Sequence, residues 1–117
     1  MKPIGHLEVE EREGVALVRL FGEVDLSNSE LILERLAAAG MGARRGLVLD
    51  LSQTEYLDSS WIWLVTRLAR TLVTGGRGFL LVVPPQAPTR RMLDLVDIGH
   101  VVGMAPSVNA AVAALTP

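Results

Sequence analysis

The segment Leu47–Val65 constrains the fold more than any other part of the sequence. It starts with Leu47–Leu51, a short run with apolar residues on both faces, which is typical of a central strand in a parallel sheet covered by helices on both sides. A short polar connection follows, and Asp58-Ser59-Ser60 then opens an amphipathic helix over residues 60–74. A buried strand followed closely by a helix predicts an α/β fold with a largely parallel sheet.

The remaining elements follow the same alternation of strands and helices. In chain order they are strands over 6–12 and 15–21, a helix from a cap at Ser27 or Asn28 to about Ala39, the strand over 47–51, the helix over 60–74, a strand over 79–83, a third helix with Pro88 in its first turn, and a last helix over 107–115. This order predicts one domain over residues 1–117, with its core over about 6–115. Its sheet has four to five strands and is mixed, because the amino-terminal hairpin is antiparallel and the remainder parallel, and about four helices accompany it.

Turn residues set the expected boundaries of these elements. Gly22–Asp25 is predicted to leave the sheet, and Gly40 and Gly42 are predicted to end the first helix. Gly75-Gly76 ends the second helix by supplying a positive φ.

Composition excludes several classes of function. The chain has 117 residues, no cysteine and a formal net charge of −2, so it offers no thiolate chemistry and no electrostatic reason to bind nucleic acid or an anionic membrane. Residues 1–6 do not form the continuous apolar segment typical of a signal peptide, and no apolar run is long enough to span a bilayer. We therefore expect a cytoplasmic protein.

Catalytic motifs are missing from the sequence. His6 and His100 lie far apart and are expected to be surface or capping residues. Ser59 and Ser60 have no G-x-S-x-G context and no nearby histidine base. Asp25, Asp50 and Asp58 could gather at the carboxyl ends of parallel strands and hold magnesium, but capped turns and a solvated carboxylate explain them more simply. We expect no enzyme, no cofactor and no metal.

Asp58-Ser59-Ser60 has two interpretations. Asp and Ser are favoured where the first amides of a helix lack partners, so the simpler interpretation is a helix cap. Two hydroxyls beside a carboxylate at a helix start also suit a phosphorylation site, because a helix amino-terminus stabilises phosphate.

The two tryptophans differ in their positions on the helix. Trp61 falls on the apolar stripe with Leu64, Val65 and Leu68, whereas Trp63 falls on the polar side with Thr66, Arg67 and Arg70. Trp63 could anchor a partner protein, or it could pack under a neighbouring loop. The arginines are expected to form a solvated face.

The sequence resembles the STAS family, and most closely the bacterial anti-sigma factor antagonists. The resemblance covers residues 6 to 115 and is carried by Phe21–Asp25, Leu47–Ser52, Tyr56–Ser60, the Gly75-Gly76 helix stop with the buried strand after it, and Arg91–Leu95.

The resemblance implies a signalling switch without enzymatic activity. Antagonists of this family bind an anti-sigma factor that is also an ATP-dependent serine kinase of the histidine-kinase-like ATPase fold, and so release its sigma factor. The kinase phosphorylates the second serine of the Asp-Ser-Ser motif, here Ser60 (with Ser59 less favoured), and a serine phosphatase removes the phosphate. Asp25 matches the family's acidic residue before the first helix, which is implicated in kinase contact. Asp58 is expected to orient and cap the site, and Asp58 and Ser59 are expected to take part in binding the partner.

The sequence departs from the family at one place. The family usually has glycines at the positions of Trp61 and Trp63. Two indoles there could block a standard kinase or select a different partner, and we expect both to shape partner binding. An alternative role within the family is a subunit of a scaffold or a transporter complex that is never phosphorylated. The sequence leaves a homodimer open.

Overall fold

The computed structural model describes residues 6–100 and 102–116. The elements in chain order are β1 (His6–Arg12), β2 (Val15–Val24), α1 (Ser29–Gly42), β3 (Gly46–Asp50), β4 (Thr54–Leu57), α2 (Ser59–Thr74), β5 (Gly78–Val82), α3 (Arg90–Leu95), the 3-10 helix η1 (Ile98–His100), β6 (Gly103–Ala105) and α4 (Val108–Leu115). The structure does not describe the side chain of His100, so the prediction that His100 is a surface or capping residue lies outside the described part of the chain.

The strands form one mixed sheet in the order β1-β2-β3-β5-β6, and β4 pairs with the carboxyl half of β2. The β1–β2 pair is antiparallel. The other four pairs are parallel: β2–β3, β2–β4, β3–β5 and β5–β6. The predicted fold class is confirmed. The sheet has six strands, more than the four to five predicted. The strands β4 and β6 were not predicted, because their four and three residues are too few to produce a clear alternation in the sequence.

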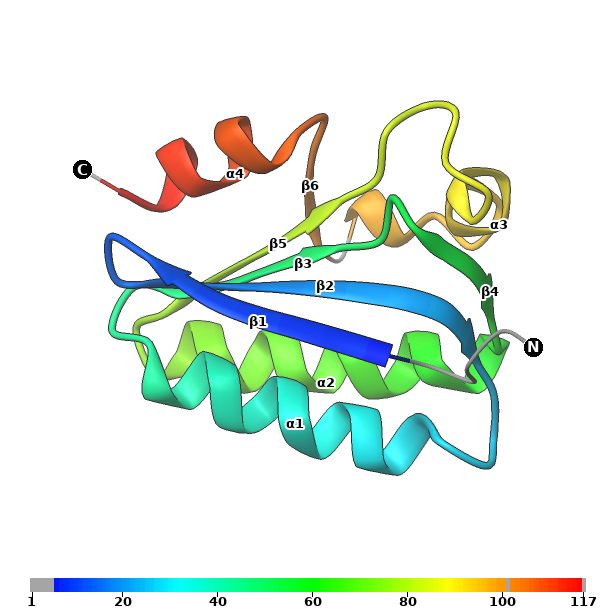
Figure 1. The fold of residues 1–117 in the computed structure, drawn as a ribbon, viewed down its shortest axis with the longest axis horizontal. Helices are drawn as coiled ribbons and strands as arrows, with labels where there is room; N and C mark the ends of the chain where they lie inside the picture. The colour runs from blue at the N-terminus through cyan, green and yellow to red at the C-terminus, as the bar shows by residue number, and fades with distance from the viewer. Residues whose placement is uncertain (1–5, 101, 117) are drawn as a thin grey trace.

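Helices cover the two faces of the sheet unequally. Figure 1 shows α1 and α2 side by side along one face, with α4 lying over part of the other face. The larger apolar cluster lies between the sheet and α1 and α2, and it includes Trp61, Leu68 and Leu72 of α2. A smaller cluster joins Val15, Leu17 and Val48 of the sheet to Ala111 and Val112 of α4. Among the described residues, no helix is long and apolar enough to cross a membrane.

The expectation that Gly22–Asp25 leaves the sheet was wrong for residues 22–24. Gly22 has a φ of +82°, and the pairing register of β2 shifts between Gly22 and Glu23. Gly22 pairs with Thr54 and Glu23 pairs with Tyr56, so β4 has one residue more than β2 between these pairs. Such an extra residue marks a bulge, which bends a strand without ending it. After the bulge, β2 continues to Val24 and pairs with β4.

Gly42 is the last residue of α1, as predicted, but the expected end at Gly40 and the expected place of Pro88 in the first turn of the third helix were wrong. Gly40 lies inside α1. Its role is to let α1 and α2 approach closely, because a Cβ there would lie 3.0 Å from a methyl of Leu72. At the third helix, Ala87 donates its amide to Pro84 O and Arg90 donates its amide to Ala87 O. These bonds form a turn that contains Pro88, so α3 begins at Arg90.

Gly46 and Gly78 bring β3 and β5 together at the start of both strands. Gly46 has a φ of +129°, and a Cβ on it would lie 2.1 Å from the carbonyl oxygen of Gly78. Neither the conformation nor the space admits a side chain, so this contact depends on glycine.

We predict that Gly46→Ala lowers the free energy of unfolding by about 2 kcal/mol or more, because the methyl group meets backbone atoms that cannot move aside. Gly42→Ala is the matched control. A Cβ there has open space around it, and the change should raise stability by about 0.4–1 kcal/mol. Urea unfolding followed by circular dichroism measures both. Equal stability of Gly46→Ala and wild type would contradict this account of the β3–β5 contact.

Candidate functional site

Asp25 and Asp58 lie beside each other because they follow paired strands. Val24 at the end of β2 pairs with Leu57 at the end of β4, and the Asp58 amide donates to Val24 O at 2.9 Å. The two carboxylates are so close that the negative charge of Asp25 acts to raise the pKa of Asp58. Of the three carboxylates that could gather, Asp25 and Asp58 lie together, and the unpredicted strand β4 brings them there.

Asp58 caps α2 through its side chain. Its Oδ1 accepts hydrogen bonds from the Ser60 amide at 2.8 Å and from the Ser60 hydroxyl at 2.7 Å. The hydroxyl bond, followed by the amide bond, lowers the pKa of Asp58 below its ordinary value of 3.8. The carboxylate is therefore ionised at neutral pH. The predicted cap by Asp58 is present, whereas Ser59 is the first residue of α2 and does not hold the cap position.

Asp25 organises the loop before α1. Its Oδ1 accepts the amide and the hydroxyl of Ser27, and the hydroxyl bond is the main reason that the pKa of Asp25 is lowered. Asn28 holds the cap position of α1, but its side chain accepts the Asp25 amide and donates to Glu23 O instead of capping the first turn. The predicted side-chain cap by Ser27 or Asn28 was therefore wrong, because both side chains serve the loop.

The two serines differ in accessibility. Ser59 is exposed at the first position of α2, whereas Ser60 is half-buried and its hydroxyl is donated to Asp58. A group added to the Ser60 hydroxyl would therefore replace that hydrogen bond and lie beside the Asp58 carboxylate.

The two tryptophans have opposite environments. Trp61 is fully buried among the side chains of the larger cluster, and its Nε1 has no hydrogen-bond partner within the part of the chain that the structure describes. Trp63 is 76% exposed. The expectation of two indoles at the surface is corrected for Trp61, which replaces a small residue by filling the core. The alternative that Trp63 packs under a loop was wrong.

Two apolar side chains that the sequence analysis did not single out flank the carboxylates. Leu26 follows Asp25 and is 74% exposed, and Tyr56, two residues before Asp58, is 50% exposed. A signal for Leu26 was available, since an apolar residue between Asp25 and Ser27 in a polar turn has no core to enter.

Asp50 is separate from the Asp25–Asp58 pair. It is buried at the end of β3, where Oδ1 accepts the Ser52 amide at 2.9 Å and Oδ2 lies 3.8 Å from Arg19 Nε. Within residues 6–100 and 102–116, no three acidic, histidine or cysteine side chains form a group that could hold a metal ion. The magnesium alternative is therefore not supported by this geometry.

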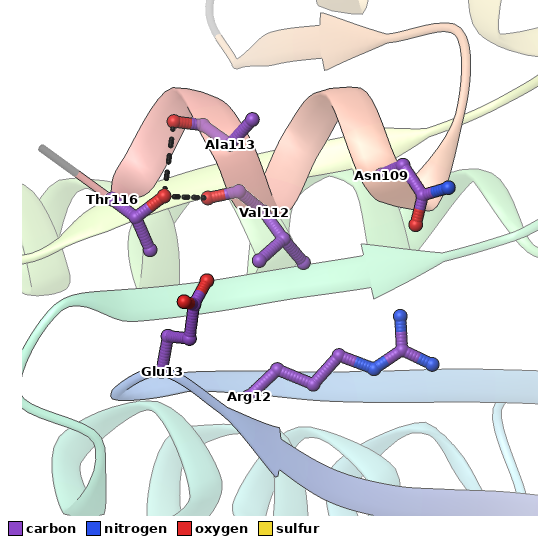
Figure 2. A pocket seen from close by; sticks show the side chains of 6 residues that line it. All are labelled: Arg12, Glu13, Asn109, Val112, Ala113 and Thr116. Atoms are coloured by element: carbon purple, nitrogen blue, oxygen red, sulfur yellow. Dashed lines mark hydrogen bonds between the residues drawn. The ribbon is translucent and has the colours of Figure 1, made fainter.

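A hollow of about 480 Å³ lies at the opposite end of the sheet, between the β1–β2 turn and α4. Figure 2 shows Arg12 extending toward Asn109, while the Glu13 carboxylate points toward α4. The Thr116 hydroxyl is donated to the carbonyls of Val112 and Ala113, and Arg12 is bonded to Glu10. This hollow shares no residue with the Asp25–Asp58 site.

We predict that Asp58→Ala lowers the midpoint of urea unfolding at pH 7, whereas Asp58→Asn, which keeps a cap acceptor, retains most of the stability. Because the folded-state pKa of Asp58 is lowered, its contribution is present above pH 3.8 and is lost as the pH falls through the lower folded-state value. The wild-type midpoint should therefore fall more steeply than that of Asp58→Asn below pH 3.8. Parallel curves for the two proteins would contradict the assignment.

Three comparisons with known proteins agree on one family. The model of the STAS domain matches residues 6–111. An anti-sigma F factor antagonist of Paenibacillus polymyxa is 28% identical over 76% of this chain and 76% of its own. The crystal structure of an anti-sigma factor antagonist from Mycobacterium paratuberculosis superposes with a TM-score of 0.81 and 26% identity, over 95% of this chain and 93% of that one.

A third relative, SpoIIAA, is known in an unphosphorylated and a phosphorylated form. The Bacillus cell fate determinant SpoIIAA in its phosphorylated form has a TM-score of 0.65 and 23% identity, over 95% of this chain and 100% of that one. At that identity the likeness shows the fold alone. Because the family model covers nearly the whole described chain, this protein belongs to the STAS domain family.

Proposed function

We propose that this protein is an anti-sigma factor antagonist that binds an anti-sigma factor through the carboxyl end of the β2–β4 pair. We define this docking face by five residues: Asp25, Leu26, Asp58, Ser60 and Trp63. The observation that carries the proposal is the pairing of Val24 with Leu57, which brings two ionised carboxylates and a serine hydroxyl to one edge of the molecule. The names of the antagonists from Paenibacillus and Mycobacterium support it.

The docking face combines the two features expected of a protein interface. Trp63 and Leu26 are exposed apolar side chains that a partner would bury, and tryptophan is enriched among residues that dominate binding energy. Asp25 and Asp58 form a negative spot beside them, so added negative charge there would repel acidic groups of the partner. With Trp61 in the core, Trp63 is the one of the two substituted glycine positions that a partner meets.

Phosphorylation of Ser60 would act as the switch. The anti-sigma factor, acting as a serine kinase, would transfer a phosphoryl group from ATP to the hydroxyl, and a serine phosphatase would remove it. A phosphate adds about −1.5 to −2 charges at pH 7. Beside Asp58 and Asp25 it would make the face strongly negative, replace the Ser60–Asp58 bond and repel acidic groups of the partner. The phosphorylated form of SpoIIAA supports this step by analogy.

The protein would act by binding and not by turnover. The Ser60 hydroxyl donates to a carboxylate whose pKa is lowered, and such a carboxylate is a poor base for activating a nucleophile. Asp58 therefore suits the role of holding the hydroxyl in position and capping the helix.

We predict that Ser60→Asp abolishes binding to the anti-sigma factor, whereas Ser60→Ala preserves it, because only the first adds charge beside Asp58. The anti-sigma factor recovered by affinity capture from native extract, purified and measured by calorimetry, provides the test. Equal binding of the two variants would contradict the switch. Equal recovery of a transporter or scaffold subunit by wild type and Ser60→Asp would favour the alternative role in an assembly that is never phosphorylated.

We also predict that Trp63→Ala weakens binding to the anti-sigma factor by about 2 kcal/mol or more, with little change in melting temperature. Val73→Ala is the matched control, since Val73 is also apolar and 62% exposed but lies near the other end of α2. It should leave binding unchanged. A large drop in melting temperature for Trp63→Ala, without loss of binding, would show that the indole serves folding instead.

A further inference from the structure

The outward face of α2 carries a row of three exposed residues. Trp63, Arg67 and Arg70 are spaced by four and three residues, which puts them on the same side of the helix, and all three are exposed. Ser59 and Ser60 lie one turn before Trp63 on this side. Figure 1 shows that α1 and α2 form one layer whose outer surface faces away from the sheet. The row is therefore open to another molecule.

Charge is separated along α2. The helix contains no Asp or Glu, and its two arginines lie in its second half. Within the described part of the chain, Arg67 and Arg70 form no ion pair with a carboxylate. The negative charge lies at the opposite end, on Asp58 and the neighbouring Asp25. One end of this surface is thus acidic and the other basic.

Such a surface is complementary to itself when a second copy lies antiparallel on it. The position midway between Asp58 and Arg70 is residue 64, and the position midway between Ser60 and Arg67 falls between residues 63 and 64. A two-fold axis beside Trp63 would therefore set Arg67 and Arg70 of each copy against Ser60 and Asp58 of the other. Asp58 and Arg70 are about 18 Å apart along the helix at 1.5 Å per residue, so both charge pairs form together with the two Trp63 indoles between them.

We propose that this face binds a second copy of the chain, and that a phosphate on Ser60 strengthens the dimer. The part of this inference that involves phosphorylation of Ser60 rests on the proposed function. The phosphate would lie between the Arg67 and Arg70 guanidinium groups of the other copy, and arginine binds phosphate through paired, charge-assisted hydrogen bonds. The second copy thus completes a phosphate site that one copy does not contain.

The unphosphorylated dimer is weak for two reasons. One helix face is a small contact compared with the roughly 800 Å² per partner of a standard interface. In addition, Glu30, Glu34 and Arg35 of α1 are exposed in the same outer layer. Their net negative charge in one copy repels the same net charge in the other copy across the two-fold axis. A phosphate on Ser60 supplies a strong negative charge that Arg67 and Arg70 of the other copy can bind. Dimerisation is therefore expected to follow phosphorylation.

The dimer has a consequence for the switch. It covers Ser60, Asp58 and Trp63, which belong to the docking face. The phosphorylated protein would be withheld from the anti-sigma factor by its own copy as well as by charge repulsion.

The test uses the full chain with phosphoserine incorporated at position 60 during translation, so no kinase is needed. We expect sedimentation velocity to show a dissociation constant at least tenfold lower for the phosphorylated chain than for wild type, with weaker association at high salt. Trp63 fluorescence should shift to the blue on association, because the exposed indole becomes buried. Arg67→Glu with Arg70→Glu should abolish the gain, whereas Arg44→Glu with Arg91→Glu, the same charge change at exposed positions off this face, should retain it.

A phosphorylated chain that stays monomeric at millimolar concentration overturns the inference, as does a dimer that survives Arg67→Glu with Arg70→Glu. If the monomeric phosphorylated chain still loses the anti-sigma factor, the dimer is wrong and the proposed function stands. A phosphate-dependent dimer that needs both arginines supports the inference whether or not an anti-sigma factor is bound.

Discussion

The pairing of the carboxyl end of β2 with β4 is the constraint on which the site depends. Without this pairing, Asp25 would have no defined relation to the start of α2. With it, four residues of β4 turn the chain so that Asp58 donates its amide to Val24 O and caps the next helix. Backbone pairing therefore determines where the charges and the serine hydroxyl lie, and the side chains add the chemistry.

The opposite environments of the two tryptophans explain how the chain departs from its family without losing the fold. Trp61 is accommodated because the cluster under α2 is aliphatic and encloses the whole indole, at the expense of an indole N–H without a partner. Burying such a donor costs about 1–3 kcal/mol, and the large apolar surface of the ring offsets it. Trp63 contributes little to that core and remains available at the surface, so one substitution affects packing and the other affects recognition.

The sequence predicted what depends on periodicity and failed where tertiary contacts decide. Leu47–Leu51 and the stripe through Trp61 and Leu68 identified the central strand and the core side of α2, because burial requires those patterns. β4 was missed since four residues with two buried positions look like a polar connection. Gly40 was misread as a helix end because its role, the approach of Leu72 from α2, exists only in the folded state. The Asp58 cap was predictable from local preference, but its nearness to Asp25 required the β2–β4 pairing.

The most direct test of the account is to map the contact surface of the anti-sigma factor on this protein by amide chemical shifts. We expect the purified anti-sigma factor to shift or broaden the amide signals of Asp25, Leu26 and the first turn of α2, together with the indole N–H signal of Trp63. The amides of the β1–β2 turn and of α4, which surround the hollow in Figure 2, should remain unchanged. Changes confined to that turn and α4, with the α2 start unaffected, would contradict the assignment of the docking face.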